Sequence, residues 1–326
     1  MKAKSHIEFV VSLTGGLGNQ LFQIAHALAR SNYSSLRLVQ EFGRPRINEL
    51  GEAEIFSFLL PFEYTKGRTK EANFLMRKIL GHTLKVSEHP EKWERSKIYK
   101  FLCRALANFV LTIYYQKLIC VSTNAIPFDF KTTHRASTLF LGYFQKMLDI
   151  DIEAIRGALR PISLETASEQ LQHEIDYALN NQITILHIRL TDYFHEPKLG
   201  LLSAEYFEKA LIGIDSSQLN NEIWVFSDDH VKAESILKFP TYVKVRFFSE
   251  KAFSVAETFE LMRYGNQYIL SNSTFGWWSA FLCKKESSNV VVPYPWFKDL
   301  NYDSSLFVPG WKEERAQWRN DLFAQG

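Results

Sequence analysis

The chain has 326 residues, about twice the length of a common single domain, which predicts two domains or one large one. Its hydrophobic share of 46% and charged share of 23% are ordinary for a globular protein and exclude a disordered, collagen-like or coiled-coil chain. The 38 basic and 36 acidic side chains leave a formal charge of +2, which is too balanced for a dedicated nucleic-acid-binding protein.

The chain opens with a strand, a turn and a helix. Residues 7–13 are a β-branched and aromatic run that predicts a strand, 14–18 are a glycine-rich turn, and 19–31 have a helical pattern. This start does not resemble a signal peptide, because its apolar stretch is short and ends in glycines. Within 36–140 one helix stands out, over 94–114, with basic side chains among aromatic ones. It is either an amphipathic helix packed on a core or a patch for a membrane surface.

From residue 138 onward strands and helices alternate regularly, which predicts βα units and a parallel, doubly wound sheet. We expect two α/β domains, 1–150 and 151–326, that face each other across a cleft. The expected strands are 138–141, 183–188, 222–226, 243–248, 267–270 and 289–292. The expected helices are 150–159, 163–179, 203–214, 231–237, 254–263, 276–283 and a polar helix at 311–324.

Cysteine usage and hydropathy bear on the cellular compartment. Cys103, Cys120 and Cys283 lie far apart and lack CxxC spacing, so neither a disulfide framework nor a zinc site is predicted, and a reducing compartment is favoured. The most apolar long stretch, 101–121, contains charged and amide side chains and falls short of the ~20 apolar residues of a membrane-spanning helix. We therefore expect a cytoplasmic protein with at most peripheral contact with a membrane.

Ligands of open parallel sheets bind beyond the carboxyl ends of the strands, so the loops after the strands are the candidate sites. After the first strand, Gly16 and Gly18 would let backbone N–H groups approach an anion, and Asn19 and Gln20 place two amides at the start of a helix. The spacing fits neither a dinucleotide-binding loop nor a Walker loop. A tight turn explains the glycines alone, whereas the paired amides favour a polar ligand.

The strand 183–188 ends in a basic pair. His187 and Arg189 are two residues apart in an extended segment, so both project from one face of the strand end. Recognition of a phosphate calls for a planar, permanently charged guanidinium that forms bidentate hydrogen bonds. The alternative is a buried structural pair between Arg189 and Asp192.

Two adjacent carboxylates, Asp228 and Asp229, follow the strand 222–226. Such a pair can hold a divalent metal ion, or it can accept hydrogen bonds from ribose hydroxyls or a guanine edge. Alternatively, one of the two simply caps the next helix. The spacing does not separate these alternatives.

The loop after the strand 267–270 is rich in hydroxyl and amide groups. They exceed what one helix cap needs, and with backbone N–H groups they predict a cradle for a pyrophosphate. The cluster consists of Ser271, Asn272, Ser273 and Thr274, followed by Phe275. Trp277 and Trp278 then fall on the helix, where core packing is the expected role.

Six segments resemble the α-1,2-fucosyltransferase family, glycosyltransferase family 11, in their order and rough spacing. Each segment alone is modest evidence, whereas six in order are strong. They are SLTGGLGNQLFQIA at 12–25, GYFQ at 142–145, HIRLTDY at 187–193, FSDD at 226–229, LSNSTFGWWSAFL at 270–282 and PYPWF at 293–297.

The resemblance implies a GT-B glycosyltransferase built from two Rossmann-like domains. It implies transfer of L-fucose from GDP-fucose to O2 of a galactose-terminated glycan, free or lipid-linked, such as a surface-polysaccharide or O-antigen precursor. The reaction would invert the anomeric carbon and require no metal or other cofactor. In the family's HxRRxD block the second arginine is Leu190 here, which leaves Arg189 as the arginine that related enzymes use on the nucleotide phosphates.

On this basis Arg189 and Asn19 are the expected catalytic residues, because they would stabilise the charge that develops on the β-phosphate. Asn19 would do so from the opposite domain. The expected substrate-binding residues are Gly16, Gly18, Gln20, His187, Asp192, Asp228, Asp229, Ser271, Asn272, Ser273, Thr274 and Phe275. The acceptor is expected at the N-terminal half, where the segment 142–145 lies.

An inverting displacement also calls for a general base. Asp192 and any carboxylate between Glu41 and Asp129 are open alternatives, and a dissociative transition state needs little base assistance. The rival functions are another nucleotide-sugar transferase, a dehydrogenase and a non-enzymatic sugar-binding protein. Thermal shift with GDP, NAD and free fucose distinguishes the fucosyltransferase from the last two.

Overall fold

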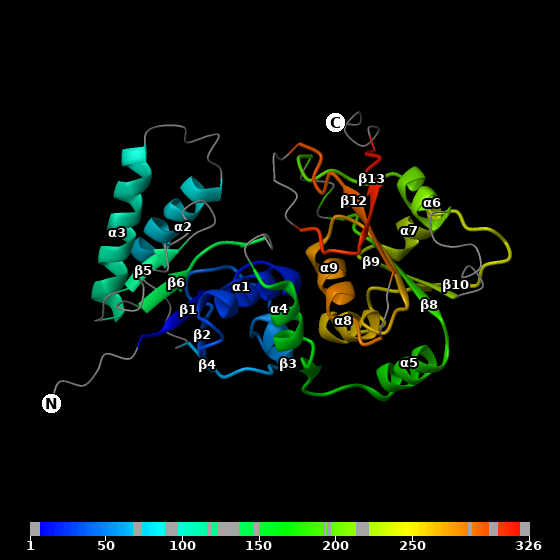
Figure 1. Cartoon of the computed structure of the whole chain (residues 1–326), viewed down its shortest axis with the longest axis horizontal. Coiled ribbons are helices and arrows are strands. Elements are labelled where there is room, and N and C mark those ends of the chain that lie inside the picture. The colour runs from blue at the N-terminus through cyan, green and yellow to red at the C-terminus, as the bar shows by residue number, and fades with distance from the viewer. Residues whose placement is uncertain are drawn as a thin grey trace. The chain divides into compact units, whose positions relative to one another are not determined.

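The computed structural model describes residues 7–67, 74–88, 97–115, 119–122, 137–145, 150–191, 193, 197–212, 222–285, 289–299 and 306–319. The chain divides into two compact units. The first unit consists of Met1–Phe56 and Leu60–Pro161, and the second consists of Ser57–Leu59 and Ile162–Gly326. Each unit has its own parallel sheet (Figure 1), which confirms the predicted α/β class with two Rossmann-like domains.

The sheet of the first unit has five parallel strands in the order β4-β2-β1-β6-β5. These are β1 (Phe9–Ser12), β2 (Leu36–Val39), β4 (Tyr64–Lys66), β5 (Ile119–Ser122) and β6 (Ser137–Phe140). The helices are α1 (Leu17–Arg30), α2 (Phe74–Glu88), α3 (Lys97–Tyr115) and α4 (Ile152–Leu159), with a 3-10 turn η1 at Glu54–Ser57. The strand order changes direction between β1 and β6, so the loops after these two strands lie at the switch point of the sheet.

The second unit contains the six-stranded parallel sheet β10-β9-β8-β11-β12-β13. The strands are β8 (Ile183–Ile188), β9 (Glu222–Ser227), β10 (Val245–Phe248), β11 (Gln267–Leu270), β12 (Asn289–Tyr294) and β13 (Lys312–Arg315), and a short antiparallel pair joins β3 (Phe58–Leu59) to β7 (Ser163–Leu164). Counted along the chain, the order is 3-2-1-4-5-6, that of a dinucleotide-binding sheet. Its switch point lies between β8 and β11.

Helices cover both faces of this second sheet. They are α5 (Glu169–Asn180), α6 (Ala204–Ile212), α7 (His230–Ile236), α8 (Val255–Met262) and α9 (Thr274–Phe281). Figure 1 shows α6 and α7 on one face, with α5, α8 and α9 on the other. All six residues of β8 are buried, as expected of a strand covered on both sides. Trp277 and Trp278 are fully buried in α9, which confirms their predicted core packing.

Two sequence predictions about elements are corrected. The helix expected over 163–179 begins later, because Ser163 and Leu164 pair with β3 and the side chain of Ser168 caps α5 by accepting from the N–H of Leu171. The helix expected over 311–324 is wrong in its described part, where 312–315 add to the sheet as β13. Residues 320–324 lie outside the described residues. The two compact units divide at Pro161, whereas the sequence predicts a domain boundary at residue 150; α4 packs on α1.

Helix α3 packs on the core of the first unit through one side. Ala107 and Leu111 are fully buried and pack with Met76 and Leu80 of α2 and with residues of the sheet, which confirms the predicted packing of this helix on a core. In the part of the chain that the structure describes, no helix combines the length and the hydropathy needed to cross a membrane.

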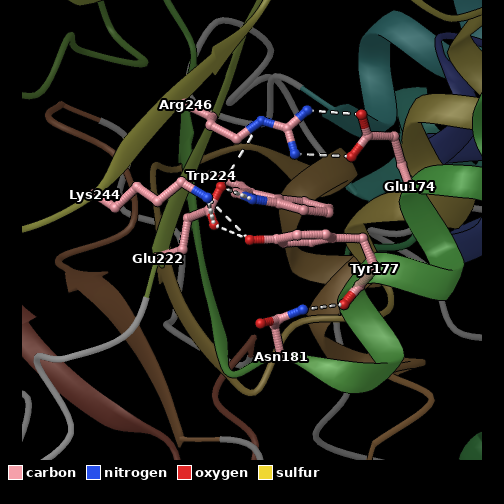
Figure 2. A network of polar contacts seen from close by, with 7 residues as sticks. All are labelled: Glu174, Tyr177, Asn181, Glu222, Trp224, Lys244 and Arg246. Atoms are coloured by element: carbon pink, nitrogen blue, oxygen red, sulfur yellow. Dashed lines mark hydrogen bonds and ion pairs between the residues drawn. The ribbon is translucent and has the colours of Figure 1, made fainter.

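A polar network joins α5 to the amino ends of β9 and β10 (Figure 2). Tyr177 and Trp224 stack with ring centroids 6.0 Å apart, and the guanidinium of Arg246 lies 5.1 Å from the centroid of Trp224. Arg246 forms a bidentate pair with Glu174, at 2.9 and 2.6 Å. The carboxylate of Glu222 accepts hydrogen bonds from Tyr177, Trp224 and Lys244. These contacts lie at the end of the sheet opposite to the ligand-binding edge, so we interpret them as structural.

Candidate active site

His187 lies at the switch point of the second unit. His187 is the register partner of Leu270, the last residue of β11. It therefore lies beside Ser271, the first residue of the loop after β11. Its Nδ1 lies 3.2 Å from Oγ of Ser271, and 4% of the residue is exposed. Burial, and secondarily the charge of Arg189, lowers the pKa of His187 to about 4. The imidazole is therefore neutral at neutral pH and can both donate and accept a hydrogen bond.

Gly276 is required by the closeness of His187. A Cβ at position 276 would lie 2.9 Å from Nδ1 and 3.0 Å from Cγ of the imidazole. The ring also has Phe275 beside it, at a centroid distance of 5.9 Å. His187 is thus held between the loop after β11 and the first turn of α9.

Arg189 is held by a carboxylate from the neighbouring strand. Its Nε lies 3.2 Å from Oδ2 of Asp228, and the two side chains are 18% and 15% exposed. The carboxylate also accepts from the backbone N–H groups of Leu190, at 2.8 Å, and Thr191, at 3.0 Å, and from the Thr191 hydroxyl. Asp228 therefore positions Arg189 and its loop, and its expected contact with ribose or guanine stays a prediction. Asp192, the partner considered from the sequence, lies outside the described residues.

Asp229 is a helix cap. Its Oδ1 accepts from the N–H of Lys232 at 3.0 Å, so it closes the start of α7. The capping alternative is thus the one the structure shows for Asp229. With Asp228 engaged by the loop after β8, the two carboxylates have separate structural tasks.

The loop after β11 leads into α9 without a side-chain cap. Ser273 occupies the N-cap position, yet it makes no capping hydrogen bond through its side chain. Asn272 is buried and donates to the backbone carbonyls of Leu199, at 2.9 Å, and Gly200, at 3.2 Å. Asn272 therefore anchors a neighbouring loop, whereas Ser273 places a hydroxyl at a helix N-terminus, where anions are favoured. Thr274 and Phe275 follow as the half-buried first residues of α9.

The switch point of the first unit brings two amides together. The Nε2 of Gln145, in the loop after β6, donates to Oδ1 of Asn19 at 2.8 Å. Gly15 precedes α1 with φ +71°, and a Cβ there would lie 2.5 Å from Nδ2 of Asn19, so glycine is needed for both reasons. The sequence predicted both loops as sites but did not predict that Asn19 and Gln145 are bonded partners.

The loop that carries Gln145 is locked by an aromatic contact. Phe144 adopts φ +51°, in the left-handed region that non-glycine residues rarely occupy. Its ring stacks on His26 with centroids 4.3 Å apart. Burial, followed by the charge of Arg30, lowers the pKa of His26 to about 3, so this imidazole is neutral at neutral pH. Strained backbone of this kind is held by its surroundings and is often found at functional sites.

The glycine-rich turn is filled by the protein's own groups. Gln20 is fully buried and donates to the carbonyls of Gly15, at 2.9 Å, and Arg46, at 3.2 Å, and it accepts from the N–H of Ile55 at 2.9 Å. A sequence-distant carboxylate, Glu54, accepts from the N–H of Leu17 at 2.6 Å.

This arrangement shows what surrounds three of the predicted site residues. The carboxylate of Glu54 lies at the N-terminus of α1 and accepts from the N–H of Leu17, while the ligand contacts expected of Gly16 and Gly18 stay predictions. Gly18 is a buried residue inside α1, and Gln20 ties the surrounding loops together. No local sequence signal links Glu54 to a helix that starts 37 residues earlier.

A family model described as "Glycosyl transferase family 11" matches residues 7–315. The chain belongs to this family. Among curated relatives, this glycosyltransferase is 29% identical over 327 residues to the O-antigen biosynthesis glycosyltransferase WbnK of Escherichia coli, covering 92% of this chain and 98% of the relative. It is 25% identical over 302 residues to an alpha-1,2-colitosyltransferase of Escherichia coli, covering 89% and 92%.

Similar solved structures are more distant. NodZ alpha-1,6-fucosyltransferase, soaked with GDP-fucose, aligns with a TM-score of 0.44 and 16% identity over 85% of this glycosyltransferase and 93% of that chain. Arabidopsis thaliana FUT1, in complex with GDP, aligns with a TM-score of 0.46 and 11% identity over 89% and 71%.

Proposed function

We propose that this glycosyltransferase transfers L-fucose from GDP-fucose to O2 of a β-galactosyl acceptor in the assembly of a surface polysaccharide. The six segments that resemble α-1,2-fucosyltransferases support this donor and linkage. The curated relatives are an O-antigen biosynthesis glycosyltransferase and an alpha-1,2-colitosyltransferase, which supports the class of pathway and the linkage position.

The observation that carries the proposal is the arrangement at the switch point of the second unit. Arg189, fixed through Nε by Asp228, follows the strand next to the loop with Ser273 and the start of α9. A guanidinium and a helix N-terminus are the two groups that proteins commonly use to bind phosphates. A nucleoside diphosphate is therefore the ligand we assign to this edge of the sheet, with neutral His187 beside it.

In the proposed reaction the acceptor hydroxyl attacks the anomeric carbon as the bond to the β-phosphate oxygen breaks. GDP leaves with the electron pair of that bond, and the hydroxyl proton passes to a base or to solvent. Arg189 and the N-terminal N–H groups of α9 would stabilise the charge that grows on the phosphate. Preorganised donors of this kind commonly contribute ~10²–10³ in rate each.

The acceptor is assigned to the first unit. Its switch point presents the bonded amides of Asn19 and Gln145, and an amide pair offers both donors and acceptors to sugar hydroxyls. Phe144 fixes the backbone of this loop, so that the amides are positioned before a ligand binds. We also propose that the reaction takes place in the cytoplasm, because the spacing of the cysteines favours a reducing compartment.

Incubation with radiolabelled GDP-fucose and a panel of β-galactosyl disaccharides tests the proposal. We expect fucose transfer and an α-1,2 linkage in the product by NMR. Transfer from another GDP-linked deoxysugar, with none from GDP-fucose, would overturn the donor assignment. A chain that binds fucose but leaves GDP unbound in thermal shift would instead be a sugar-binding protein.

We also propose that catalysis needs no divalent metal. The two carboxylates that could serve as ligands, Asp228 and Asp229, are engaged by Arg189 and by the N-terminus of α7. Activity is expected to survive excess EDTA. Loss of activity in EDTA with rescue by Mg²⁺ or Mn²⁺ would make these aspartates metal ligands and overturn this part of the proposal.

A further inference from the structure

Helix α1 contacts two consecutive residues of the loop after β6. Oδ1 of Asn19 accepts from Nε2 of Gln145 at 2.8 Å. The imidazole of His26 stacks on the ring of Phe144, with centroids 4.3 Å apart and an angle of 18° between the ring planes. Asn19 and His26 are separated by about two helical turns, so they lie on the same side of α1. One side of the helix therefore holds the loop at two neighbouring points.

The backbone of Phe144 accounts for this double contact. Consecutive side chains of an extended segment point to opposite sides, whereas Phe144 and Gln145 both contact α1. With φ +51°, Phe144 departs from the extended conformation and lies in the left-handed region. A residue with a Cβ persists in this region only where its surroundings favour it. The loop therefore depends on a contact that offsets the cost of this conformation.

An aromatic cluster supplies that contact. The ring of Phe144 is buried and meets the ring of Phe140 edge-on, with centroids 6.2 Å apart. Phe140, at the end of β6, also lies edge-on to His26, at a centroid distance of 5.7 Å. Two of these three rings come from β6 and its loop, and the third comes from α1. His26 is therefore the ring that ties the loop to the helix.

The helix that carries His26 is fixed at another point. Gln23 is fully buried, and its Nε2 donates to the carbonyl of Thr14 at 3.2 Å. Its Oε1 accepts from the N–H of Thr14 at 3.0 Å. This pair of hydrogen bonds ties α1 to the end of β1 without involving the loop after β6. When His26 is altered, we therefore expect the loop to change and the helix to stay in place.

The stack is a contact between two uncharged rings, because the imidazole of His26 is neutral at neutral pH. A phenyl ring at this position offers a similar aromatic face. The methyl group of alanine does not reach Phe144. Substitution by phenylalanine therefore keeps the stack, and substitution by alanine removes it.

We propose that His26 is a positioning residue for the acceptor, because its stack on Phe144 holds the loop after β6. In the conformation held in this way, Gln145 is bonded to Asn19. The acceptor part rests on the proposed function, which assigns the acceptor to this amide pair, whereas the loop part rests on the contacts alone. Groups that are ordered before binding strengthen binding, since the ligand does not have to order them.

Hydrogen–deuterium exchange of the full chain without ligand tests the loop. In His26→Ala we expect the segment 141–145 to exchange about tenfold faster or more, since local opening becomes easier without the stack. His26→Phe should exchange like the unchanged chain. The matched control is Leu28→Ala, which removes a buried side chain from another side of α1. It should lower Tm without a selective change in 141–145.

Steady-state kinetics on the same variants test the acceptor. His26→Ala should raise the KM for the acceptor by about tenfold, with kcat at saturating acceptor and the Kd for GDP both unchanged. In His26→Phe the KM should return to that of the unchanged chain. An equal rise in KM in Leu28→Ala would overturn the proposal, because lost stability would then explain it. So would an equal rise in His26→Phe, because the ring nitrogens would then be the groups that matter.

The two measurements separate this proposal from the proposed function. If the exchange of 141–145 is the same in His26→Ala as in the unchanged chain, the stack does not hold the loop and the proposal is wrong, whatever sugar is transferred. Faster exchange with an unchanged acceptor KM would also overturn it, because the order of the loop would then not serve the acceptor. An unchanged chain that transfers no fucose to any β-galactosyl acceptor would overturn the proposed function and the acceptor role of His26. The exchange result would still decide whether the stack holds the loop.

Discussion

Arg189 depends on Asp228 for its direction, since the contact at Nε aims the guanidinium from the end of β8. Replacing Arg189 with Lys keeps the charge but removes the planar fork and the Nε contact. We expect kcat/KM with GDP-fucose to fall by about 10²-fold or more with an unchanged circular-dichroism spectrum. Near-normal turnover by Arg189→Lys would show that the guanidinium has no role on the phosphates.

Gly276 lies so close to His187 that a larger residue would disturb the candidate site. In Gly276→Ala the new Cβ meets the buried ring of His187 at 2.9 Å, so the ring or α9 must shift. Overpacking of this kind costs about 1–3 kcal/mol, and we expect a lower Tm and weaker GDP binding by calorimetry. The control is Gly157→Ala in α4, where no atom lies within 4 Å of the new Cβ. It should leave GDP binding unchanged and stabilise the chain by up to about 1 kcal/mol.

Sequence reasoning predicted Arg189 and His187 because strand ends can be read from local patterns. It did not predict that Asp228 holds Arg189, since this contact depends on β9 pairing beside β8. The strand order was the missing information. The same holds for Glu54 at the start of α1, which a tertiary contact brings there.

At the scale of elements, the network of Figure 2 makes the stability of the second unit depend on pH. Burial alone would raise the pKa of Glu222, but hydrogen bonds from Lys244, Tyr177 and Trp224 outweigh it and lower the pKa below 4.5. The carboxylate accepts from Lys244 at 2.6 Å and from Tyr177 at 2.7 Å. A carboxyl group whose pKa is lower in the folded state stabilises the fold at pH values above its unfolded pKa. That contribution is lost as the pH falls through the folded pKa.

We therefore expect Glu222→Gln to have a lower Tm at neutral pH and a shallower loss of Tm between about pH 5 and pH 3 than the unchanged chain. Calorimetric scans across this pH range measure both effects. Glu205→Gln is the control, because Glu205 pairs with Lys209 on an exposed helix face and such pairs contribute little. A pH profile of Glu222→Gln that is parallel to that of the unchanged chain would show that Glu222 is not the group that titrates.

Elements were predictable where local pattern and tertiary context agree. β8 and β11 have the predicted bounds, because apolar runs between turns specify buried strands. β13 was missed, since Lys312–Arg315 reads KEER, which favours a polar helix. Among the described residues, β13 is an edge strand that pairs with β12, so it needs no apolar side chains and its sequence carries no strand pattern. β7 was missed because its partner β3 lies far away in sequence.

For the whole molecule, two sheets each have a switch point, and the proposed function gives them different ligands. In that proposal the donor binds to the second unit and the acceptor to the first. Asn19 and Ser273 are matched probes of this division, because each is a polar side chain at the start of a helix that follows a switch-point strand.

The two substitutions should separate kinetically. Ser273→Ala removes a hydroxyl at the start of α9, and we expect the Kd for GDP to rise by about tenfold, a loss of about 1.4 kcal/mol. Asn19→Ala leaves Gln145 without its partner in the first unit, so GDP affinity should change less, while the KM for the acceptor should rise by roughly 10- to 100-fold. Isothermal titration with GDP and steady-state kinetics on the same preparations measure both. Ser235→Ala and Asn180→Ala, at exposed helix positions, should change neither quantity. If Asn19→Ala is kinetically silent, the amide pair is structural and the acceptor must be assigned elsewhere in the first unit.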